Sequence, residues 1–375
     1  MDTKKIICIA GTRPEAIKMS PVIKRLKQEN IFNVTVLATG QHTDMLRQAF
    51  ADFWITADYD LNIMRQAQSL DYILSSVLNG VGKFLDDNGA DLVLVHGDTS
   101  TTFAAALASF YRNIPVGHVE AGLRSNNIKL PFPEEANRVL TDRIADLFFA
   151  PTEIDAENLK REGISDNKIF ITGNTVIDAL YEILKRENNS LNYLSDYDFE
   201  KSPLILMTAH RRESWGEKLK GICAAVNDIL DARPDVKFLI PLHKNPVVRE
   251  VIKSELASKS ANIIFTEPLN YPDFVHAMNK SFFILSDSGG VQEEASAINK
   301  PVLIMRELSE RPEAITHGTC ILTGTDRNKI RDTALKLLNN PAELDNILSK
   351  NTMPFGNGKS SEKICAVIKN FWEVK

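Results

Sequence analysis

The fold class of this chain is indicated by residues 5–39, KIICIAGTRPEAIKMSPVIKRLKQENIFNVTVLAT, in which an amphipathic segment separates two short apolar runs. The runs at 5–10 and 33–39 are rich in Ile, Val and Leu, as are strands buried on both faces of a parallel sheet. The segment between them starts with Thr12, Pro14 and Glu15, which suit the N-cap, first turn and capping box of a helix. The stretch therefore predicts a strand, a helix and a second strand.

The same alternation continues along nearly the whole chain. Further strands are predicted at 91–95, 115–119, 147–150, 169–172, 204–208, 236–241, 262–266, 282–286 and 301–305. Helical patterns lie between strands, as at 69–85, 100–111, 218–230 and 330–338. Alternating strands and helices predict an α/β fold with parallel sheets and right-handed crossovers.

The length and a polar stretch predict two domains. At about 150 residues per domain, 375 residues suggest two or three. The polar residues 186–203 separate two similar halves, although the linker could begin nearer Gly173. We predict a first domain of residues 1–172 plus a C-terminal helix at 360–375, and a second domain of residues 173–359. This helix must dock on another element, and we expect it to cross back to the first half. It carries one apolar stripe, formed by Ile364, Val367, Ile368, Phe371 and Trp372.

The composition narrows the functional class. Lys and Arg number 44 against 49 Asp and Glu, and the resulting charge of −5 excludes a protein held on nucleic acid by bulk positive charge. No apolar run reaches the roughly 18 residues of a transmembrane helix, and the N-terminal run is too short for a signal peptide. The four cysteines form no CxxC pair, which favours buried free thiols over a disulfide or zinc site. We expect a cytoplasmic protein without a nucleic-acid or membrane partner.

Ligands of open α/β sheets bind outside the carboxyl ends of the strands, so polar residues that directly follow strands are candidate site residues. Arg13 and Lys18 follow the first strand. Cations at the N-terminal end of a helix are disfavoured by roughly a few tenths of a kcal/mol, so these two suit a bound anion.

Three acidic residues of the first half, Asp98, Glu120 and Glu134, also follow predicted strands or begin a predicted helix. Asp98 has a structural interpretation in a turn that caps a helix, and Glu134 has one in an i,i+4 pair with Arg138. Glu120 leaves a buried strand and is harder to explain as solvated surface. Taken together, the three carboxylates suggest acid–base chemistry.

In the second half, the sequence Asp287-Ser288-Gly289-Gly290 precedes a predicted helix. Backbone N–H groups there can approach a phosphate, and Glu294, one turn later, can accept ribose hydroxyls. This pattern indicates a nucleotide diphosphate. The absence of GxGxxG and GxxxxGK[ST] argues against a classical NAD site and a P-loop. His210 follows another strand beside two arginines, whereas His243 is expected to be structural.

The ordered blocks along the chain resemble the non-hydrolysing UDP-N-acetylglucosamine 2-epimerases over essentially the full length. The blocks are GTRPEAIKMSPV, GQH, DYDLNIM, HGDT, GHVEAGLRS, PFPEEANR, FITGNTVIDAL, AHRRES, DSGGVQEE, PVLIMRELSERPEA and PFGNGKSS. That family is similar in fold to the GT-B glycosyltransferases, which implies two Rossmann-like domains with parallel sheets facing each other across a cleft.

The resemblance also implies roles for individual residues. The implied catalytic set is Asp98, Glu120, Glu134, His210, Arg13 and Lys18. The implied contacts to the UDP-sugar add Arg138, Leu269, Phe274, Ser288, Gly289, Gly290, Glu294 and Arg311. Some bacterial members bind a second substrate molecule as an activator, and the matching positions are Gln41, His42 and Arg211. An arginine expected near them in that subgroup is replaced here by Ala67, with Arg65 two residues earlier.

The chemistry implied by the resemblance is reversible inversion of carbon 2 of the sugar, which converts UDP-N-acetylglucosamine to UDP-N-acetylmannosamine for surface polysaccharide synthesis. A base removes the proton on carbon 2 while UDP leaves carbon 1, and UDP then adds back to the 2-acetamidoglucal. This route needs no metal and no redox cofactor, and the family implies a homodimer. A GT-B glycosyltransferase, a hydrolysing epimerase and an inactive nucleotide-sugar sensor are the alternatives.

Overall fold

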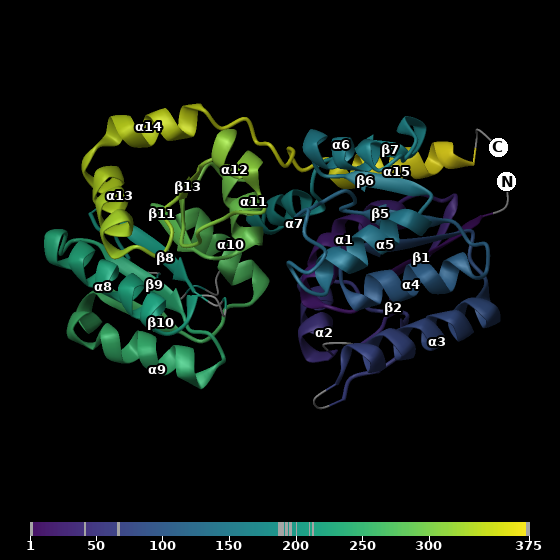
Figure 1. Ribbon diagram of the computed structural model, residues 1–375, viewed down its shortest axis with the longest axis horizontal. Helices are drawn as coiled ribbons and strands as arrows, with labels where there is room; N and C mark the ends of the chain where they lie inside the picture. The colour runs from purple at the N-terminus through teal and green to yellow at the C-terminus, as the bar shows by residue number, and fades with distance from the viewer. Residues whose placement is uncertain are drawn as a thin grey trace. The chain divides into compact units, whose positions relative to one another are not determined.

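The computed structural model describes residues 3–40, 43–65, 68–186, 191, 194, 197–199, 201–209, 211 and 214–372. It divides into two compact units (Figure 1), of which unit 1 comprises Met1–Glu182 with Phe355–Lys375 and unit 2 comprises Ile183–Pro354.

Unit 1 is built on a seven-stranded sheet in the order β3-β2-β1-β4-β5-β6-β7, in which every pairing is parallel. The strands are β1 (Lys4–Ala10), β2 (Phe32–Ala38), β3 (Tyr59–Asp60), β4 (Leu92–His96), β5 (Val116–Val119), β6 (Leu147–Ala150) and β7 (Ile169–Ile171). The helices are α1 (Arg13–Lys27), α2 (Thr43–Asp52), α3 (Leu70–Asn88), α4 (Ser100–Phe110), α5 (Glu134–Ile144), α6 (Glu153–Arg161), α7 (Thr175–Leu184) and α15 (Ser360–Phe371), with a 3₁₀ turn at Asp166–Lys168. This strand order is that of a Rossmann fold.

Unit 2 repeats the plan with a six-stranded parallel sheet in the order β10-β9-β8-β11-β12-β13. The strands are β8 (Leu204–Thr208), β9 (Lys237–Pro241), β10 (Ile263–Thr266), β11 (Phe283–Ser286), β12 (Val302–Ile304) and β13 (Cys320–Leu322). The helices are α8 (Glu217–Ala232), α9 (Pro246–Glu255), α10 (Tyr271–Lys280), α11 (Gly289–Ala297), α12 (Pro312–Thr316), α13 (Arg327–Asn339) and α14 (Pro341–Ser349), with a 3₁₀ segment at Ala257–Asn262.

The prediction of two parallel α/β halves is confirmed. Residues of β4, β5, β6 and β11 are buried throughout, which explains why their sequences show no polar alternation. Two edge strands were not predicted, β3 and β13, because two or three residues are too few to establish a period. Pro21 lies inside a continuous α1, where Ser20 Oγ donates to the carbonyl of Ala16 at 2.6 Å.

The unit boundary lies between Glu182 and Ile183, ten residues after the predicted one between 172 and 173. The reason is that α7 is tied to the returning chain. The N–H of Asn174 donates to the carbonyl of Phe355 at 2.8 Å, and the Asp178 carboxylate accepts the N–H of Ser360 at 3.0 Å. It also accepts the N–H and Oγ of Ser361, at 2.8 and 2.6 Å.

Helix α15 packs against α1 and lies among the elements of unit 1 in Figure 1 (yellow, near the C-terminus). Lys369 of α15 forms an ion pair with Glu29 at 2.6 Å. The last helix is therefore part of the first unit although the second unit precedes it in sequence.

We expect Asp178→Ala to lower the free energy of unfolding by about 2–4 kcal/mol, because two buried backbone donors at the start of α15 lose a charged acceptor. Asp326→Ala is the control, since Asp326 caps α13 at an exposed position by accepting the N–H of Lys329, and should cost about 1 kcal/mol. Urea denaturation followed by circular dichroism measures both. A loss for Asp178→Ala no larger than that for Asp326→Ala would contradict the assignment.

The four cysteines are buried free thiols, as predicted, and burial raises the pKa of Cys8 and of Cys223 to about 12. Among the described residues, no helix is long and apolar enough to span a membrane. The same residues contain no group of three or more His, Cys, Asp or Glu side chains that could hold a metal ion.

Candidate active site

A buried carboxylate joins the turn after β1 to the turn after β4. Glu15, 2% exposed, accepts the N–H groups of Gly11 and Thr12 at 2.8 and 2.7 Å, which confirms the predicted capping box. Its other oxygen accepts the hydroxyls of Thr99 and Thr102 at 2.6 and 2.9 Å. Burial raises the pKa of Glu15 even though these hydrogen bonds act in the opposite direction. The two turns are thereby held together.

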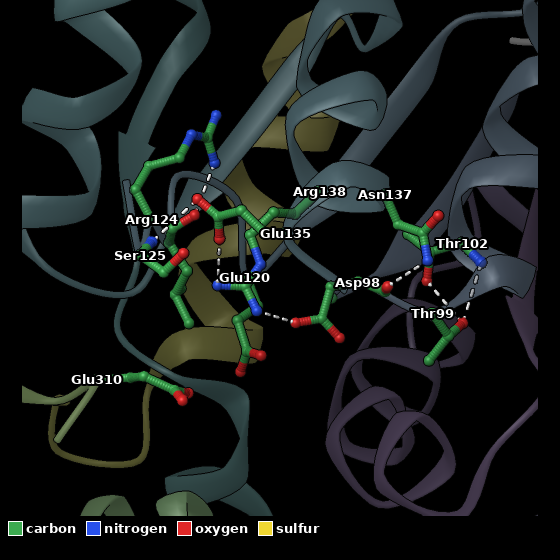
Figure 2. Close-up of polar contacts among 12 residues, drawn as sticks. Asp98, Thr99, Thr102, Glu120, Arg124, Ser125, Glu135, Asn137, Arg138 and Glu310 are labelled. Atoms are coloured by element: carbon green, nitrogen blue, oxygen red, sulfur yellow. Dashed lines mark hydrogen bonds and ion pairs between the residues drawn. The ribbon is translucent and has the colours of Figure 1, made fainter. Parts of the chain in front are cut away.

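Asp98 does not cap the helix that follows it. Thr99 is the N-cap of α4, and its side chain accepts the N–H of Thr102 at 3.1 Å. The Asp98 carboxylate instead forms an ion pair with Arg138 of α5. The backbone carbonyl of Asp98 accepts a hydrogen bond from Nδ2 of Asn137 at 2.9 Å (Figure 2). The predicted turn glycine and helix cap are present in Gly97, with φ +68°, and Thr99, so the Asp98 carboxylate is not needed for the cap.

Glu120 follows β5, and a lysine from α1 reaches it. Lys18, 9% exposed, forms an ion pair with Glu120 Oε2, and Nδ2 of Asn174 donates to the same oxygen at 2.9 Å. The anion beside Lys18 is thus a side chain of the protein, while Arg13 is the first, partly exposed residue of the same helix. The backbone of Glu120 has φ +66°, a strained conformation for a residue with a side chain, and such strain concentrates at functional sites.

The start of α5 differs from its prediction. Arg138, 5% exposed, pairs with Glu135 at 3.2 Å and with Asp98, so the predicted i,i+4 pair with Glu134 is wrong. Glu135 is buried and also accepts the N–H of Ser125 at 2.9 Å (Figure 2). Within the described part of the chain, the partly exposed Glu134 forms no ion pair. Glu134 is four residues from Arg138 in sequence, but Arg138 pairs with Asp98 and not with Glu134.

His96 and Asn174 belong to this site although neither was predicted. His96 ends β4, is 3% exposed, and places Nε2 3.7 Å from Glu120 Oε2. Burial, together with the positive charge of Lys18, lowers the pKa of His96 to about 3, so its ring is neutral near pH 7. Among described residues, neither ring nitrogen has a hydrogen-bond partner. His96 ends β4 and Asn174 follows β7, so their positions at strand ends could have indicated them as candidates from the sequence.

In unit 2, the predicted phosphate site is the start of α11. Ser288 is its N-cap, and Gly289 and Gly290 are its first two residues. A Cβ added to Gly289 would lie 4.0 Å from the guanidinium of Arg311, so a small residue leaves space between this helix end and a cation. Backbone N–H groups, a hydroxyl and a guanidinium meet here, which is a suitable environment for an anion.

Arg311 is held in place by α11 itself. Its Nε forms an ion pair with Glu293, which is 1% exposed. The backbone N–H of Arg311 donates to Ser309 Oγ at 3.0 Å, and the Ser309 hydroxyl donates to Gln292 Oε1 at 2.6 Å. The loop that carries Arg311 is therefore fixed to the helix whose N-terminus it approaches.

Two further arginines gather around the same loop. Burial alone would raise the pKa of Glu310, but Arg311, Arg306 and Arg211 together lower it. Arg306 pairs with Glu310 at 3.2 Å, and the N–H of Arg211 donates to Asp287 Oδ2 at 2.8 Å. The structure thus places Arg211 with the predicted phosphate-binding residues of its own unit.

A hydrogen bond links the predicted ribose residue to the segment that contains the predicted uracil residues. Glu294, 6% exposed, accepts the hydroxyl of Tyr271 at 2.8 Å, so one of its oxygens already has a donor. Leu269 and Phe274 flank the start of α10 and are partly exposed. Tyr271 was not predicted as a site residue. The predicted residues His210, Gln41 and His42 lie outside the described residues.

Comparisons with known proteins show which family the chain resembles. The model of the UDP-N-acetylglucosamine 2-epimerase family matches residues 24–369. The UDP-N-acetylglucosamine 2-epimerase of Escherichia coli is 44% identical over 372 residues, which cover 98% of each chain. The crystal structure of the enzyme of Neisseria meningitidis bound to UDP-GlcNAc has a TM-score of 0.90 at 44% identity, covering 98% of this chain and 100% of that one.

A more distant structure, the Methanocaldococcus jannaschii UDP-GlcNAc 2-epimerase in complex with UDP-GlcNAc and UDP, has a TM-score of 0.81 at 34% identity. The match covers 98% of this chain and 99% of the M. jannaschii chain. Identity at these levels extends over nearly the full length of both proteins. The chain therefore belongs to the UDP-N-acetylglucosamine 2-epimerase family.

Proposed function

We propose that this protein interconverts UDP-N-acetylglucosamine and UDP-N-acetylmannosamine by inverting carbon 2 of the sugar, without net hydrolysis. The observation that carries the proposal is the pair of carboxylates after the neighbouring parallel strands β4 and β5, in a chain of this family. Asp98 and Glu120 each have their own cation, Arg138 and Lys18. Two separately held carboxylates suit a reaction that must exchange a proton on both faces of one carbon.

The proposed reaction is an elimination followed by an addition. One carboxylate takes the proton from carbon 2, and the electron pair of that C–H bond forms the double bond between carbons 1 and 2. The bond from carbon 1 to the phosphate oxygen breaks, and UDP leaves with that electron pair. UDP then adds back to carbon 1 of the 2-acetamidoglucal while an acid protonates carbon 2 on the opposite face. Asp98, Glu120 and Glu134 are the proposed acids and bases.

The departing UDP gains negative charge, so groups that stabilise an anion lower the barrier. In unit 2, the N-terminus of α11 and Arg311 supply backbone donors and a cation that the ion pair with Glu293 holds in position. Donors fixed before the reaction need no reorganisation when the charge develops. We assign the diphosphate to these groups, the ribose to Glu294, and the uracil to the segment containing Leu269 and Phe274.

The function is tested by incubating the full-length protein with UDP-N-acetylglucosamine in heavy water and following the sugar by proton NMR. We expect UDP-N-acetylmannosamine, with deuterium at carbon 2 of both epimers. Steady accumulation of free UDP and free N-acetylmannosamine would instead indicate a hydrolysing epimerase. Epimerisation without deuterium at carbon 2 would overturn the elimination, and an unchanged substrate would overturn the activity itself.

We expect Tyr271→Phe to raise KM for UDP-N-acetylglucosamine by about tenfold, because Glu294 loses the donor that orients it toward the ribose. The effect should shrink for a 2′-deoxyuridine analogue of the substrate, which lacks one of the hydroxyls that Glu294 binds. Tyr197→Phe is the matched control, since the Tyr197 hydroxyl donates to Ser202 elsewhere in unit 2. Steady-state kinetics would contradict the assignment if both variants changed KM equally. It would also be contradicted if Tyr271→Phe raised KM for the analogue by the same factor as for UDP-N-acetylglucosamine.

The family resemblance also supports a homodimer that supplies UDP-N-acetylmannosamine for surface polysaccharide synthesis. Light scattering coupled to size-exclusion chromatography measures the assembly directly, and a mass near twice the 41.9 kDa of one chain is expected.

A further inference from the structure

An asparagine outside the predicted set of site residues contacts one of the candidate acid–base carboxylates. Asn174 follows β7, is 2% exposed, and donates from Nδ2 to Glu120 Oε2 at 2.9 Å. Lys18 of α1 forms an ion pair with the same oxygen. Glu120 Oε2 is therefore held by two donors that come from different elements of unit 1.

The local turn fixes which end of the Asn174 amide faces Glu120. Asn174 Oδ1 accepts the N–H of Val176 at 3.0 Å. A backbone N–H only donates, so the atom opposite it must be the amide oxygen, and the NH2 group then points toward Glu120. Because an amide does not titrate, the Asn174 side chain donates to Glu120 at every pH of interest.

The backbone of Asn174 is anchored where the chain re-enters unit 1. The N–H of Asn174 donates to the carbonyl of Phe355 at 2.8 Å. Two glycines cross closely beside this bond, since a Cβ on Gly356 would lie 3.2 Å from Cα of Gly173. Both have positive φ, +89° for Gly173 and +103° for Gly356, which glycine adopts readily. The block PFGNGKSS thus contributes to the placement of Asn174.

The two donors decide which oxygen of Glu120 can exchange a proton. A carboxylate oxygen offers about two lone-pair positions. At Oε2 the Lys18 ammonium and the Asn174 amide take them. A proton on Glu120 is therefore placed on Oε1. This oxygen lies toward the turn that precedes Asp98, because a Cβ on Gly97 would be 3.7 Å from it.

We propose that Asn174 is a positioning residue for the epimerase reaction: together with Lys18 it holds Glu120 Oε2, so that Oε1 is the oxygen that exchanges a proton with carbon 2 of the sugar. The proposal rests on the proposed function and deepens it. In the direction in which Glu120 is the base, the proton of carbon 2 moves to Oε1 and the electron pair of the C–H bond forms the double bond. In the reverse direction Oε1 returns that proton to carbon 2.

Asn174→Asp separates this positioning role from a purely local one. The new side chain has the same shape, and its oxygen still accepts the N–H of Val176. When ionised it cannot donate, and it places a second negative charge where the amide lies 2.9 Å from Glu120 Oε2. Like charges so close repel, so Glu120 should leave its position. At lower pH two such carboxyl groups share one proton, which restores a donor.

Two other titratable groups face Glu120 Oε2 and bear on the pH profile. Lys18 of α1 is ion-paired with it, and His96 of β4 places Nε2 3.7 Å from it. Burial lowers the pKa of His96 to about 3, so its ring is neutral over the working range. Neither residue is changed in the variants, so a difference from wild type reports on position 174.

The experiment measures kcat and KM for wild type, Asn174→Asp and Asn174→Ser from about pH 6 to about pH 9, since kcat reports groups that titrate in the enzyme–substrate complex. For Asn174→Asp, the ratio of wild-type to variant kcat should be about 10–100 at the alkaline end, the cost of a small misplacement of a reacting group, with little change in KM. At the acid end the ratio should be no larger. A ratio near one at the alkaline end, or one that grows toward the acid end, would overturn the proposal.

Asn174→Ser keeps the test decisive if the like charges prevent Asn174→Asp from folding. A serine hydroxyl can accept the N–H of Val176 as the amide oxygen does, but it is too short to reach Glu120. It adds no charge, so we expect kcat to fall by about tenfold, the worth of one hydrogen bond to a charged group, with KM little changed. Wild-type kcat in Asn174→Ser would overturn the proposal.

Asn340 supplies the matched control. It is exposed, directly precedes α14, and its side chain accepts the N–H of Glu343. Asn340→Asp and Asn340→Ser should leave kcat at the wild-type value, because Asp and Ser cap a helix about as well as Asn. Thermal denaturation of every variant separates loss of folding from misplacement, and equal losses at Asn340 and Asn174 would refute the assignment. If wild type had no epimerase activity, the proposed function would fail, whereas an active wild type matched by Asn174→Ser would refute only the positioning role.

Discussion

Glu120→Gln is expected to lower kcat for UDP-N-acetylglucosamine by about 10²–10⁴-fold, the usual contribution of a positioned general acid or base. The amide keeps the size of the side chain and can still accept a hydrogen bond from Asn174. It cannot take up a proton, and it leaves the largely buried Lys18 without its anion. Formation of UDP-N-acetylmannosamine, followed by NMR, measures the loss.

The matched control for Glu120→Gln is Glu182→Gln. Glu182 also pairs with a lysine of α1, Lys24, at 2.5 Å, but at a more exposed position, where an ion pair contributes little. We expect its kcat to stay close to that of wild type. The assignment of Glu120 would be refuted by near-wild-type turnover in Glu120→Gln, or by an equal loss in both variants. Thermal denaturation of Glu120→Gln separates loss of chemistry from loss of folding.

Asp98→Asn is expected to cause a loss of similar size, about 10²–10⁴-fold in kcat. Asp98 is partly exposed, and its carboxylate is the group that Arg138 orients. The amide would keep a hydrogen bond to that guanidinium but could not exchange a proton with the substrate. Asp87→Asn is the control, since Asp87 pairs with Lys83 on an exposed face of α3 at 2.7 Å.

The reverse reaction supplies an internal check on Asp98→Asn and Glu120→Gln. A catalyst leaves the equilibrium constant unchanged, so kcat/KM must fall by the same factor from either epimer. Turnover of both UDP-sugars should therefore be measured with each variant. If Asp98→Asn retained normal turnover, the proton transfers would have to be assigned to Glu120 and Glu134 instead.

The chain alone was enough to predict the parallel α/β class and most of the strands. Strands such as β4 and β11 are buried on both faces, and such strands appear in the sequence as continuous apolar runs. Asp98, Glu120 and Ser288 could be predicted as candidates because each follows a strand, and a parallel sheet collects such positions at one edge. The unit boundary was less accurate, because what holds α7 in unit 1 is its contact with α15.

Partner choice was decided only by the tertiary structure. Lys18 and Glu120 are 102 residues apart, and Asp178 lies 182 residues from Ser360, so no local period relates them. Arg138 shows the same limit at short range: helical spacing permits a pair with Glu134, but the fold offers Glu135 and Asp98. Sequence patterns report which side chains are buried, whereas an ion pair depends on which groups the packed chain brings within reach. For this reason the sequence determined the fold class and the candidate carboxylates, and the tertiary structure determined which cations hold them.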